Sequence, residues 1–343
     1  MVKVAINGFG RIGRVSLRTI LKYYSDQVEV VAINTSGSMD VEGWAHLFEY
    51  DTVYRKYEGA VKTQVSDVDG EIGHLVVEGY VIPLLAQREP TKIPWQKYQP
   101  EIVLEATGIF RDKNSASQHL KVGAGKVIIT APPKSKEIPI YIIGVNDKNY
   151  RGEKLVSIGS CTTNCVVPVC KVILDNFKIE EAMMTTIHAY TADQDLVDGS
   201  HKDLRRARAA AQNIVPTTTG ADEAAIAVLP GLRGRFAATA VRVPIICGSY
   251  SDFTFKMVEK TTAEKVNAVL RQAAEGELQK ILSYSEEPLV SADILGTTHS
   301  AIIDSQLTEV VSDDLVQVIA WYDNEWAYCC RLIEMAILAG THK

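Results

Sequence analysis

The order of apolar and polar positions divides the chain into two parts of different character. In the first part, a strand is predicted over Val2–Ile6, a helix over Ile12–Tyr24 and a second strand over Val28–Ile33. Near-continuous apolar runs, typical of strands buried on both faces, follow at Ile102–Leu104, Lys126–Thr130, Ile140–Ile143 and Leu155–Ile158. This pattern predicts a doubly wound α/β domain with a mainly parallel sheet, into which the more polar stretch Tyr50–Gly79 inserts an antiparallel piece.

From Glu181 the pattern changes to that of an α+β domain with a mainly antiparallel sheet. Phe253, Phe255 and Met257 alternate with polar residues, as in a strand with one buried face. Thr261 and Glu264 have capping-box spacing before a helical pattern. The last two predicted elements are a strand over Ser312–Tyr322 and a helix over Asn324–Ala339 ended by Gly340.

A chain of 343 residues exceeds the size at which a single hydrophobic core stops growing, so two domains are expected. The break is predicted near Gly159. We expect a dinucleotide-binding domain over residues 1–159 plus 325–343, with the last helix returning to it, and a catalytic domain over residues 160–324.

Composition narrows the class of protein without naming its chemistry. Lys plus Arg is 36 and Asp plus Glu is 42, which gives a net charge of −6. This acidic balance predicts no nucleic-acid or membrane partner, so any phosphate group has to be bound by a local site. No apolar run has membrane-spanning length, and Val4–Ile6 is too short for a signal peptide, so a cytoplasmic protein is expected. The six cysteines lack zinc-type spacing, which predicts reduced thiols and no metal site.

A glycine-rich loop, Gly8-Phe9-Gly10-Arg11-Ile12-Gly13, joins the first strand to the first helix. Glycines at these positions allow a tight turn and let a pyrophosphate approach the helix N–H groups. The loop pattern alone is weak evidence, but its strand–loop–helix–strand context favours dinucleotide binding.

The end of the second strand indicates which dinucleotide. An NAD site usually has an acidic residue there for the ribose 2′-hydroxyl. This chain has Asn34-Thr35-Ser36-Gly37-Ser38, with no acid before Asp40. Small hydroxyls in place of a carboxylate favour the 2′-phosphate of NADP, and NAD use stays possible.

Cys161 is the candidate nucleophile. It lies in Ser160-Cys161-Thr162-Thr163-Asn164-Cys165, after a strand and before a helical pattern that runs to Phe177. The positive end of a helix lowers a thiol pKa, and its N–H groups can hold an oxyanion. The alternative is a buried packing residue, which is the interpretation we give to Cys165 and Cys170.

His188 is the candidate base, because it ends an apolar strand where a polar side chain requires a reason. The other histidines lie in polar or loop contexts and are predicted to be surface residues: His46, His74, His119, His201, His299 and His342. Spacing alone does not pair His188 with Cys161.

Seven motifs stand in order along the chain: NGFGRIGR from Asn7, SCTTNC from Ser160, HAYT from His188, DLRRARA from Asp203, TTTGA from Thr217, RVP from Arg242 and WYDNEW from Trp321. Over essentially its full length the sequence closely resembles phosphorylating glyceraldehyde-3-phosphate dehydrogenase. The resemblance implies that Cys161 attacks glyceraldehyde 3-phosphate, that His188 activates the thiol, and that inorganic phosphate cleaves the resulting thioester.

The resemblance also implies binding roles. Thr191 and Arg242 would bind the substrate phosphate, and the attacking phosphate would be bound by Ser160, Thr162, Arg206, Thr219 and Gly220. Asn324 would hold the nicotinamide carboxamide. The other implied cofactor contacts are Asn7, Gly8, Gly10, Arg11, Ile12, Asn34, Thr35, Arg88, Thr107, Gly108, Thr130 and Ser200. Arg205 and Arg208 are assigned to a solvated face or a subunit contact.

Several positions depart from the usual pattern of this family. Thr35 replaces the NAD-selecting Asp and Ser200 a Pro common in NAD enzymes, and both replacements resemble NADP-using relatives. Asp222 and Glu223 follow TTTGA where Ala-Lys is usual, and acids that point inward there would weaken phosphate binding. Ile245–Ser249 and Ala327 also differ, which leaves room for different substrate details.

Two alternatives remain. In erythrose-4-phosphate dehydrogenase the thioester is hydrolysed, and a regulatory dinucleotide-binding protein would lack turnover. The intact set of Cys161, His188, Arg206 and Arg242 favours an enzyme. The resemblance further implies a homotetramer in which the loop Tyr190–Pro216 contacts a neighbouring subunit's cofactor region.

Overall fold

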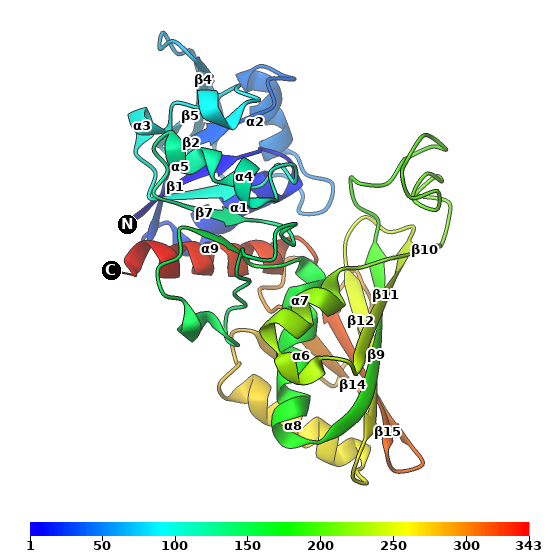
Figure 1. Ribbon diagram of the computed structural model, residues 1–343. Helices are drawn as coiled ribbons and strands as arrows, with labels where there is room; N and C mark the ends of the chain where they lie inside the picture. Colours follow the sequence, from blue (N-terminus) through cyan, green and yellow to red (C-terminus); the bar gives the residue numbers. More distant parts are fainter. Residues whose placement is uncertain (343) are drawn as a thin grey trace. The chain divides into compact units, whose positions relative to one another are not determined.

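The computed structural model describes residues 1–342, which form two compact units (Figure 1). Unit 1 consists of residues Met1–Tyr141 and Asp147–Gly159 together with the C-terminal segment from Cys329, and unit 2 consists of Ile142–Asn146 and Ser160–Tyr328. Unit 2 thus extends past residue 324, where the sequence placed its end.

Unit 1 is built on an eight-stranded sheet in the order β3-β4-β5-β2-β1-β6-β7-β8. Its strands are β1 Val2–Asn7, β2 Val28–Asn34, β3 Val61–Gln64, β4 Glu71–Val77, β5 Tyr80–Leu85, β6 Ile102–Glu105, β7 Lys126–Ile129 and β8 Leu155–Ser157. The pairings from β5 through β8 are parallel, whereas β3-β4 and β4-β5 are antiparallel. The doubly wound sheet with an antiparallel insertion is therefore confirmed.

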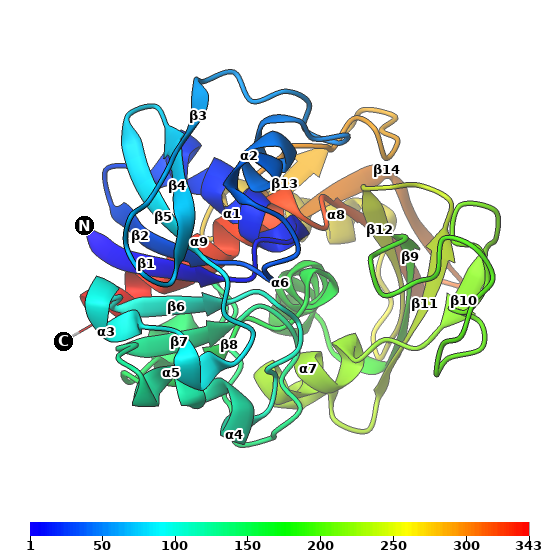
Figure 2. The same ribbon diagram turned by 90° about the horizontal axis from the view of Figure 1, so that it is seen from above.

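Helices cover both faces of this sheet (Figures 1 and 2). They are α1 Arg11–Thr19, continued by a π-helical turn over Ile20–Tyr24, α2 Val41–Glu49, α3 Trp95–Tyr98, α4 Lys113–Ala116, α5 Gln118–Lys121 and α9 Trp326–Thr341, with short 3-10 turns at Pro90–Lys92 and Asp147–Asn149. One face packs Ala5, Val103 and Val127 against Trp95. The opposite face is in contact with the C-terminal part of α9, where Gly340 lies against Val2.

Unit 2 contains a seven-stranded sheet in the order β10-β11-β9-β12-β15-β14-β13. Its strands are β9 Ile179–Ala189, β10 Val215–Thr217, β11 Phe236–Val243, β12 Ser249–Met257, β13 Leu282–Ser285, β14 Ala301–Val311 and β15 Leu315–Tyr322. Four pairings are antiparallel, and β11-β9 and β13-β14 are parallel, so the mainly antiparallel sheet is confirmed.

The helices of unit 2 are α6 Cys161–Asn176, α7 Ala221–Val228 and α8 Ala263–Glu275, with a 3-10 turn at Pro230–Leu232. Figure 1 shows α6 and α8 on one face of the sheet, where both pack against β14. The alternation of buried and half-buried positions along β12 agrees with one covered face, because Phe253 and Phe255 are fully buried toward the helices.

Four local predictions are wrong. Ile140–Ile143 is not a strand, because only Ile140 forms a bridge, to Ser157. Thr262, not Thr261, caps α8 by accepting a hydrogen bond from the Lys265 N–H. The last helix begins at Trp326 and continues through Gly340. His119 is fully buried rather than at the surface, since Glu105 and Trp95 supply its polar partners.

Gly340 should tolerate no larger side chain while Val2 is present. A Cβ added at Gly340 would lie 2.3 Å from Val2 Cγ1, so Gly340→Ala forces β1 and α9 apart. We expect a loss of about 1–3 kcal/mol in the free energy of unfolding, measured by denaturant titration. The double variant Val2→Ala/Gly340→Ala should lose less than the two single variants together, and strict additivity would contradict the steric explanation.

Candidate active site

Cys161 is the first residue of α6, and the cap of this helix fixes its position. The Ser160 hydroxyl accepts from the Thr163 N–H at 3.0 Å, and the Thr163 hydroxyl accepts from the Ser160 N–H at 3.1 Å, which completes a capping box. The thiol therefore sits at the positive end of a sixteen-residue helix with a defined start.

His188 lies beside the thiol, near the end of β9. Its Nε2 is 3.4 Å from Cys161 Sγ, and its Nδ1 is 2.7 Å from the Ala189 carbonyl oxygen. A carbonyl only accepts, so Nδ1 carries the ring proton and Nε2 presents its lone pair to the thiol. Burial and the neighbouring Arg242 charge lower the pKa of His188 to about 3, so the imidazole is neutral and able to act as a base.

Arg242 extends toward His188 from β11, whose register pairs Arg242 with His188 on β9. One guanidinium nitrogen donates to the Ala189 carbonyl oxygen and to the Thr191 hydroxyl, both at 3.0 Å, and approaches His188 Nδ1 to 3.2 Å. Thr191 and Arg242, both expected to bind the substrate phosphate, are thus brought together next to the thiol and imidazole.

The expected fall in the thiol pKa is not what the structure shows. Burial raises the pKa of Cys161, and the Arg242 charge and the Thr162 N–H only partly oppose it. The helix terminus was readable from the sequence, whereas the degree of burial was not. Burial therefore opposes transfer of the thiol proton to His188 Nε2 before a substrate is bound.

Tyr322 is a buried neighbour that the sequence pattern did not single out, although it belongs to the WYDNEW motif. Its hydroxyl hydrogen-bonds with the hydroxyls of Thr162 at 3.0 Å and Thr186 at 2.8 Å, and burial raises its pKa well above the usual range. The ring meets His188 edge-on, with centroids 5.9 Å apart. Thr162, an expected phosphate ligand, therefore has its hydroxyl bonded to Tyr322.

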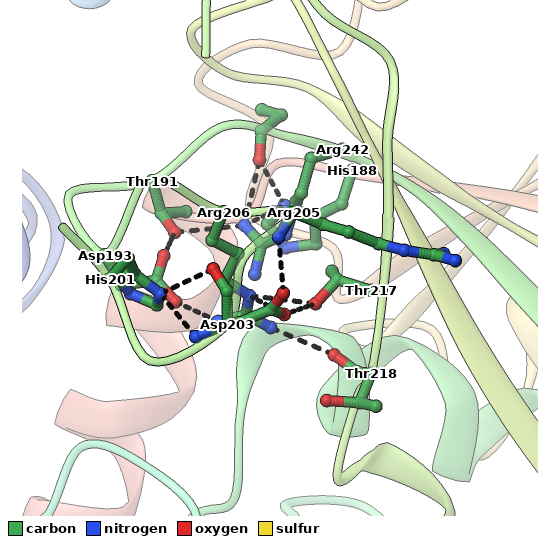
Figure 3. Close-up of polar contacts among 11 residues, drawn as sticks. His188, Thr191, Asp193, His201, Asp203, Arg205, Arg206, Thr217, Thr218 and Arg242 are labelled. Carbon is green, nitrogen blue, oxygen red and sulfur yellow. Dashed lines mark hydrogen bonds and ion pairs between the residues drawn. The ribbon is translucent and has the colours of Figure 1, made fainter. Parts of the chain in front are cut away.

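Arg206 lies in a second polar cluster, which contains two acids that the sequence pattern did not reveal (Figure 3). Its Nε donates to the Thr217 hydroxyl at 2.9 Å and one terminal nitrogen donates to the Thr218 carbonyl oxygen at 3.0 Å. The other terminal nitrogen pairs with Asp193, and Asp203 lies 3.5 Å from Nε. Arg205 and Arg208 are both exposed, and Arg208 pairs with Asp198 rather than joining this cluster.

Asp193 connects the two groups of expected phosphate ligands. It accepts from the Thr191 hydroxyl on one side and pairs with Arg206 on the other (Figure 3). Burial would raise the pKa of Asp193, but the Thr191 hydrogen bond and the charges of Arg242 and Arg206 hold it below its usual value. An ionised carboxylate therefore occupies donors that an incoming phosphate would use.

The other residues expected to bind the attacking phosphate lie at two helix starts. Ser160 caps α6, and Gly220 precedes α7, where the Thr219 hydroxyl accepts from the Ala221 N–H at 3.2 Å. Asp222 and Glu223 lie in the first turn of α7, where acidic side chains favour the helix and oppose an anion.

The glycine loop of unit 1 has the shape that a dinucleotide requires. Gly8 has φ +101°, and a Cβ there would lie 2.8 Å from the backbone of Ala106 and Thr107. A Cβ at Gly13 would lie 2.1 Å from the Gly8 carbonyl oxygen. Gly10 precedes α1 without a side-chain cap, and a Cβ added there would meet nothing within 4 Å. The backbone is therefore open to a pyrophosphate, and the loop fits the group.

The end of β2 carries no carboxylate. The buried Thr35 hydroxyl donates to the Leu85 carbonyl oxygen at 2.9 Å, so it is engaged inside the unit. Outside it lies a cavity of about 380 Å³ lined by Ser36, Gly37, Ala86, Gln87, Arg88, Glu89 and Lys92. Arg88 Nε donates to the Ser36 carbonyl oxygen at 3.2 Å, which holds an exposed guanidinium at this cavity.

The remaining expected cofactor contacts fall in both units. In unit 1, Arg11 pairs with Asp51, and Asn7, Asn34, Thr107 and Thr130 bond to one another or to Glu105. In unit 2, the Asn324 amide oxygen accepts from the Gly248 N–H at 3.0 Å and the Ser249 hydroxyl at 3.1 Å, while Ser200 lies in an exposed loop.

Comparison with known families and proteins agrees with this geometry. Residues 2–113 match the NAD binding domain of glyceraldehyde 3-phosphate dehydrogenase, and residues 160–324 match its C-terminal domain. The chain belongs to the glyceraldehyde-3-phosphate dehydrogenase family. It is therefore an NAD(P)-dependent oxidoreductase with a Rossmann-type domain and a catalytic domain, as the sequence predicted.

Relatives of this dehydrogenase come from distant organisms. Glyceraldehyde-3-phosphate dehydrogenase 2 of Bacillus subtilis is 47% identical over 97% of this chain and 95% of its own length. The chloroplastic enzyme A of Chlamydomonas reinhardtii is 46% identical over 98% of this chain and 88% of its own length. Enzyme 1 of Kluyveromyces lactis is 44% identical over 98% of both chains. Among residues 1–342, no helix combines the length and apolarity needed to cross a membrane.

The pH dependence of Cys161 alkylation should reveal the raised thiol pKa. Only the thiolate reacts, so the iodoacetamide rate should rise about tenfold per pH unit through neutral and mildly alkaline pH. Arg242→Gln removes a charge that opposes the shift, which raises the thiol pKa further and lowers the rate at fixed pH, whereas Arg242→Lys keeps the charge. A rate already independent of pH at neutrality contradicts this expectation.

Removal of the Asp193 charge should strengthen phosphate binding. In Asp193→Asn the Thr191 hydroxyl keeps a partner, but Arg206 loses the closer of its two carboxylates and keeps only Asp203, so we expect the KM for inorganic phosphate to fall about threefold. Initial rates at varied phosphate measure this change. Asp198→Asn, which removes an exposed partner of Arg208, is the matched control and should leave the KM unchanged. A higher KM in Asp193→Asn would show that the carboxylate assists phosphate instead.

Proposed function

We propose that this dehydrogenase reversibly converts glyceraldehyde 3-phosphate and inorganic phosphate to 1,3-bisphosphoglycerate through a thioester on Cys161, with NADP preferred to NAD. The observation that supports this best is the 3.4 Å approach of a neutral His188 to the Cys161 thiol, beside Arg242 and Thr191. A nucleophile, its base and an anion-binding guanidinium in contact match a phosphorylated aldehyde.

In the first step, Cys161 Sγ forms a bond to the aldehyde carbon while its proton passes to His188 Nε2. The Arg242 guanidinium and the Thr191 hydroxyl hold the substrate phosphate and so orient the aldehyde. His188 passes this proton on to the oxyanion, which forms the hemithioacetal hydroxyl, and takes it back from that hydroxyl as the carbonyl reforms. The bound dinucleotide supplies the acceptor for the hydride that leaves the same carbon.

In the second step, a phosphate oxygen attacks the thioester carbonyl, and the carbon–sulfur bond breaks to leave the thiolate, which is reprotonated by His188. Arg206 is the cation assigned to this phosphate. The N–H groups at the start of α6 are suited to the oxyanion that forms at each attack. Because the product is an acyl phosphate, the energy of oxidation is kept.

Two features support a preference for NADP. Thr35 stands at the position where a carboxylate would repel a 2′-phosphate. Exposed Arg88 and Lys92, together with the Ser36 hydroxyl, line the adjoining cavity and provide positive charge and a donor. The relatives include enzymes named as chloroplastic, such as those of Chlamydomonas reinhardtii and Pisum sativum.

A homotetramer accompanies this proposal. The loop between β9 and β10 exposes four large apolar side chains, Leu196, Val197, Leu204 and Ile214, each at 70% or more. An apolar set of this size on one loop suits burial against a second subunit.

Steady-state kinetics with NAD and NADP, each with and without phosphate, test the proposal. We expect the oxidation of glyceraldehyde 3-phosphate to require phosphate and kcat/KM to be higher with NADP. Arg88→Gln should lower kcat/KM for NADP by about tenfold and leave that for NAD unchanged, because a charge-assisted bond to the 2′-phosphate is lost. Turnover without phosphate would favour the hydrolytic alternative, and equal or better efficiency with NAD would refute the cofactor preference.

A further inference from the structure

A buried carboxylate lies at the centre of unit 1 and takes no part in the chemistry described above. Glu105 ends β6, and its side chain is 1% exposed. One carboxylate oxygen accepts from Asn7 Nδ2 at 2.5 Å and from His119 Nε2 at 3.0 Å. The other accepts from the Thr107 N–H at 3.0 Å and from the Thr107 hydroxyl. Four donors converge on one acceptor group.

The next residue of the network, His119, is held in one tautomer. The indole Nε1–H of Trp95 donates to His119 Nδ1 at 3.0 Å, so that nitrogen carries no proton. The ring proton is therefore on Nε2, directed at Glu105. Both Trp95 and His119 are fully buried, so leaving the polar atoms of either side chain without a hydrogen bond would be costly. The indole thus fixes the ring that supports the carboxylate.

In the other direction the network reaches the carboxyl ends of two neighbouring strands. The Asn7 amide oxygen accepts from Asn34 Nδ2 at 2.7 Å, and Asn34 exchanges hydrogen bonds with the backbone of Gln87 at 2.8 and 2.9 Å. Asn7 ends β1 and Asn34 ends β2. The sheet register places Asn7 beside Asn34 on one side and beside Glu105 on the other. The dinucleotide site of such a sheet lies beyond these carboxyl ends.

The turn after Glu105 is also the surface against which the glycine loop packs. A Cβ on Gly8 would meet the Ala106 carbonyl carbon and the Thr107 nitrogen at 2.8 Å, so the loop and the turn touch without a side chain between them. Glu105 fixes the Thr107 N–H from the opposite side. Any shift of that turn would therefore be passed directly to the loop that receives the pyrophosphate.

We propose that Glu105 and His119 are positioning residues for the dinucleotide: one buried carboxylate, oriented by the Trp95–His119 pair, sets the geometry of the Gly8 loop, the Thr107 turn and the β2 terminus. A carboxylate is required because every partner is a donor, and an amide would place its own N–H₂ against two of them. The inference rests on dinucleotide binding by the family and not on the proposed choice between NAD and NADP.

Glu105→Gln tests the carboxylate. We expect the Kd of both NAD and NADP, measured by fluorescence titration of the whole enzyme, to rise by about tenfold, and by the same factor for each. Iodoacetamide alkylation of Cys161 without dinucleotide should keep its wild-type rate, because the thiol and His188 belong to unit 2. Glu101→Gln is the matched control: Glu101 precedes β6 at its other end, and its carboxylate accepts from the exposed Lys3 N–H, so the Kd of this variant should be unchanged.

A matched pair at His119 separates positioning from packing. In His119→Gln the side chain can accept from Trp95 and donate to Glu105, so Kd should stay within about twofold of wild type, whereas His119→Leu should show the full rise. Trp95→Phe removes the indole donor to His119 Nδ1 but keeps an aromatic ring in the core, so the rise in Kd should fall between those of His119→Gln and His119→Leu. Thermal unfolding shows whether each variant is folded at the titration temperature. Folded Glu105→Gln with wild-type Kd values, equal Kd values for His119→Gln and His119→Leu, or a loss confined to one dinucleotide would each overturn the proposal.

Discussion

The contact between His188 Nε2 and Cys161 Sγ is the constraint on which the chemistry proposed for unit 2 depends. It joins the first residue of α6 to the end of a central strand, so it exists only if the helix lies in register on its sheet. The capping box fixes one end, and the Ala189 carbonyl fixes the tautomer at the other. Burial raises the pKa of the thiol and lowers the pKa of the imidazole, so it opposes a buried ion pair between them, which would be costly to desolvate.

The sequence predicted the parts of this site better than their arrangement. Cys161 and His188 stood out because each placed a reactive side chain at the end of a regular element. Their contact, over 27 positions of the chain, requires β9 to lie beside β12, a strand against which α6 packs. The side chains that bury the Cys161 thiol come from residues distant in sequence. The sequence therefore did not show that burial raises the thiol pKa.

Other errors have the same origin in long-range contacts. His119 was predicted at the surface because its neighbours in sequence are polar, yet Trp95 and Glu105 enclose it from 24 and 14 residues away. The sequence around Asp193 does not reveal its role, because Arg206 lies beside it only in the folded chain. Ile140–Ile143 is apolar because Tyr141 and Ile142 are buried, although both lie outside any strand. An apolar run in the sequence indicates that the segment is buried, but it does not indicate that the segment pairs with a neighbouring strand.

The contact of Gly340 with Val2 has a consequence for the order in which the protein assembles. Val2 and Gly340 are separated by nearly the whole of the described chain, so their contact closes a very long loop. The strands of unit 2, in contrast, follow one another within a single interval of the chain. Contacts between such distant segments form slowly, so we expect α9 to cover β1 late in folding. Until then the apolar face of β1 stays exposed, which makes it a site where the partly folded first unit is prone to aggregate.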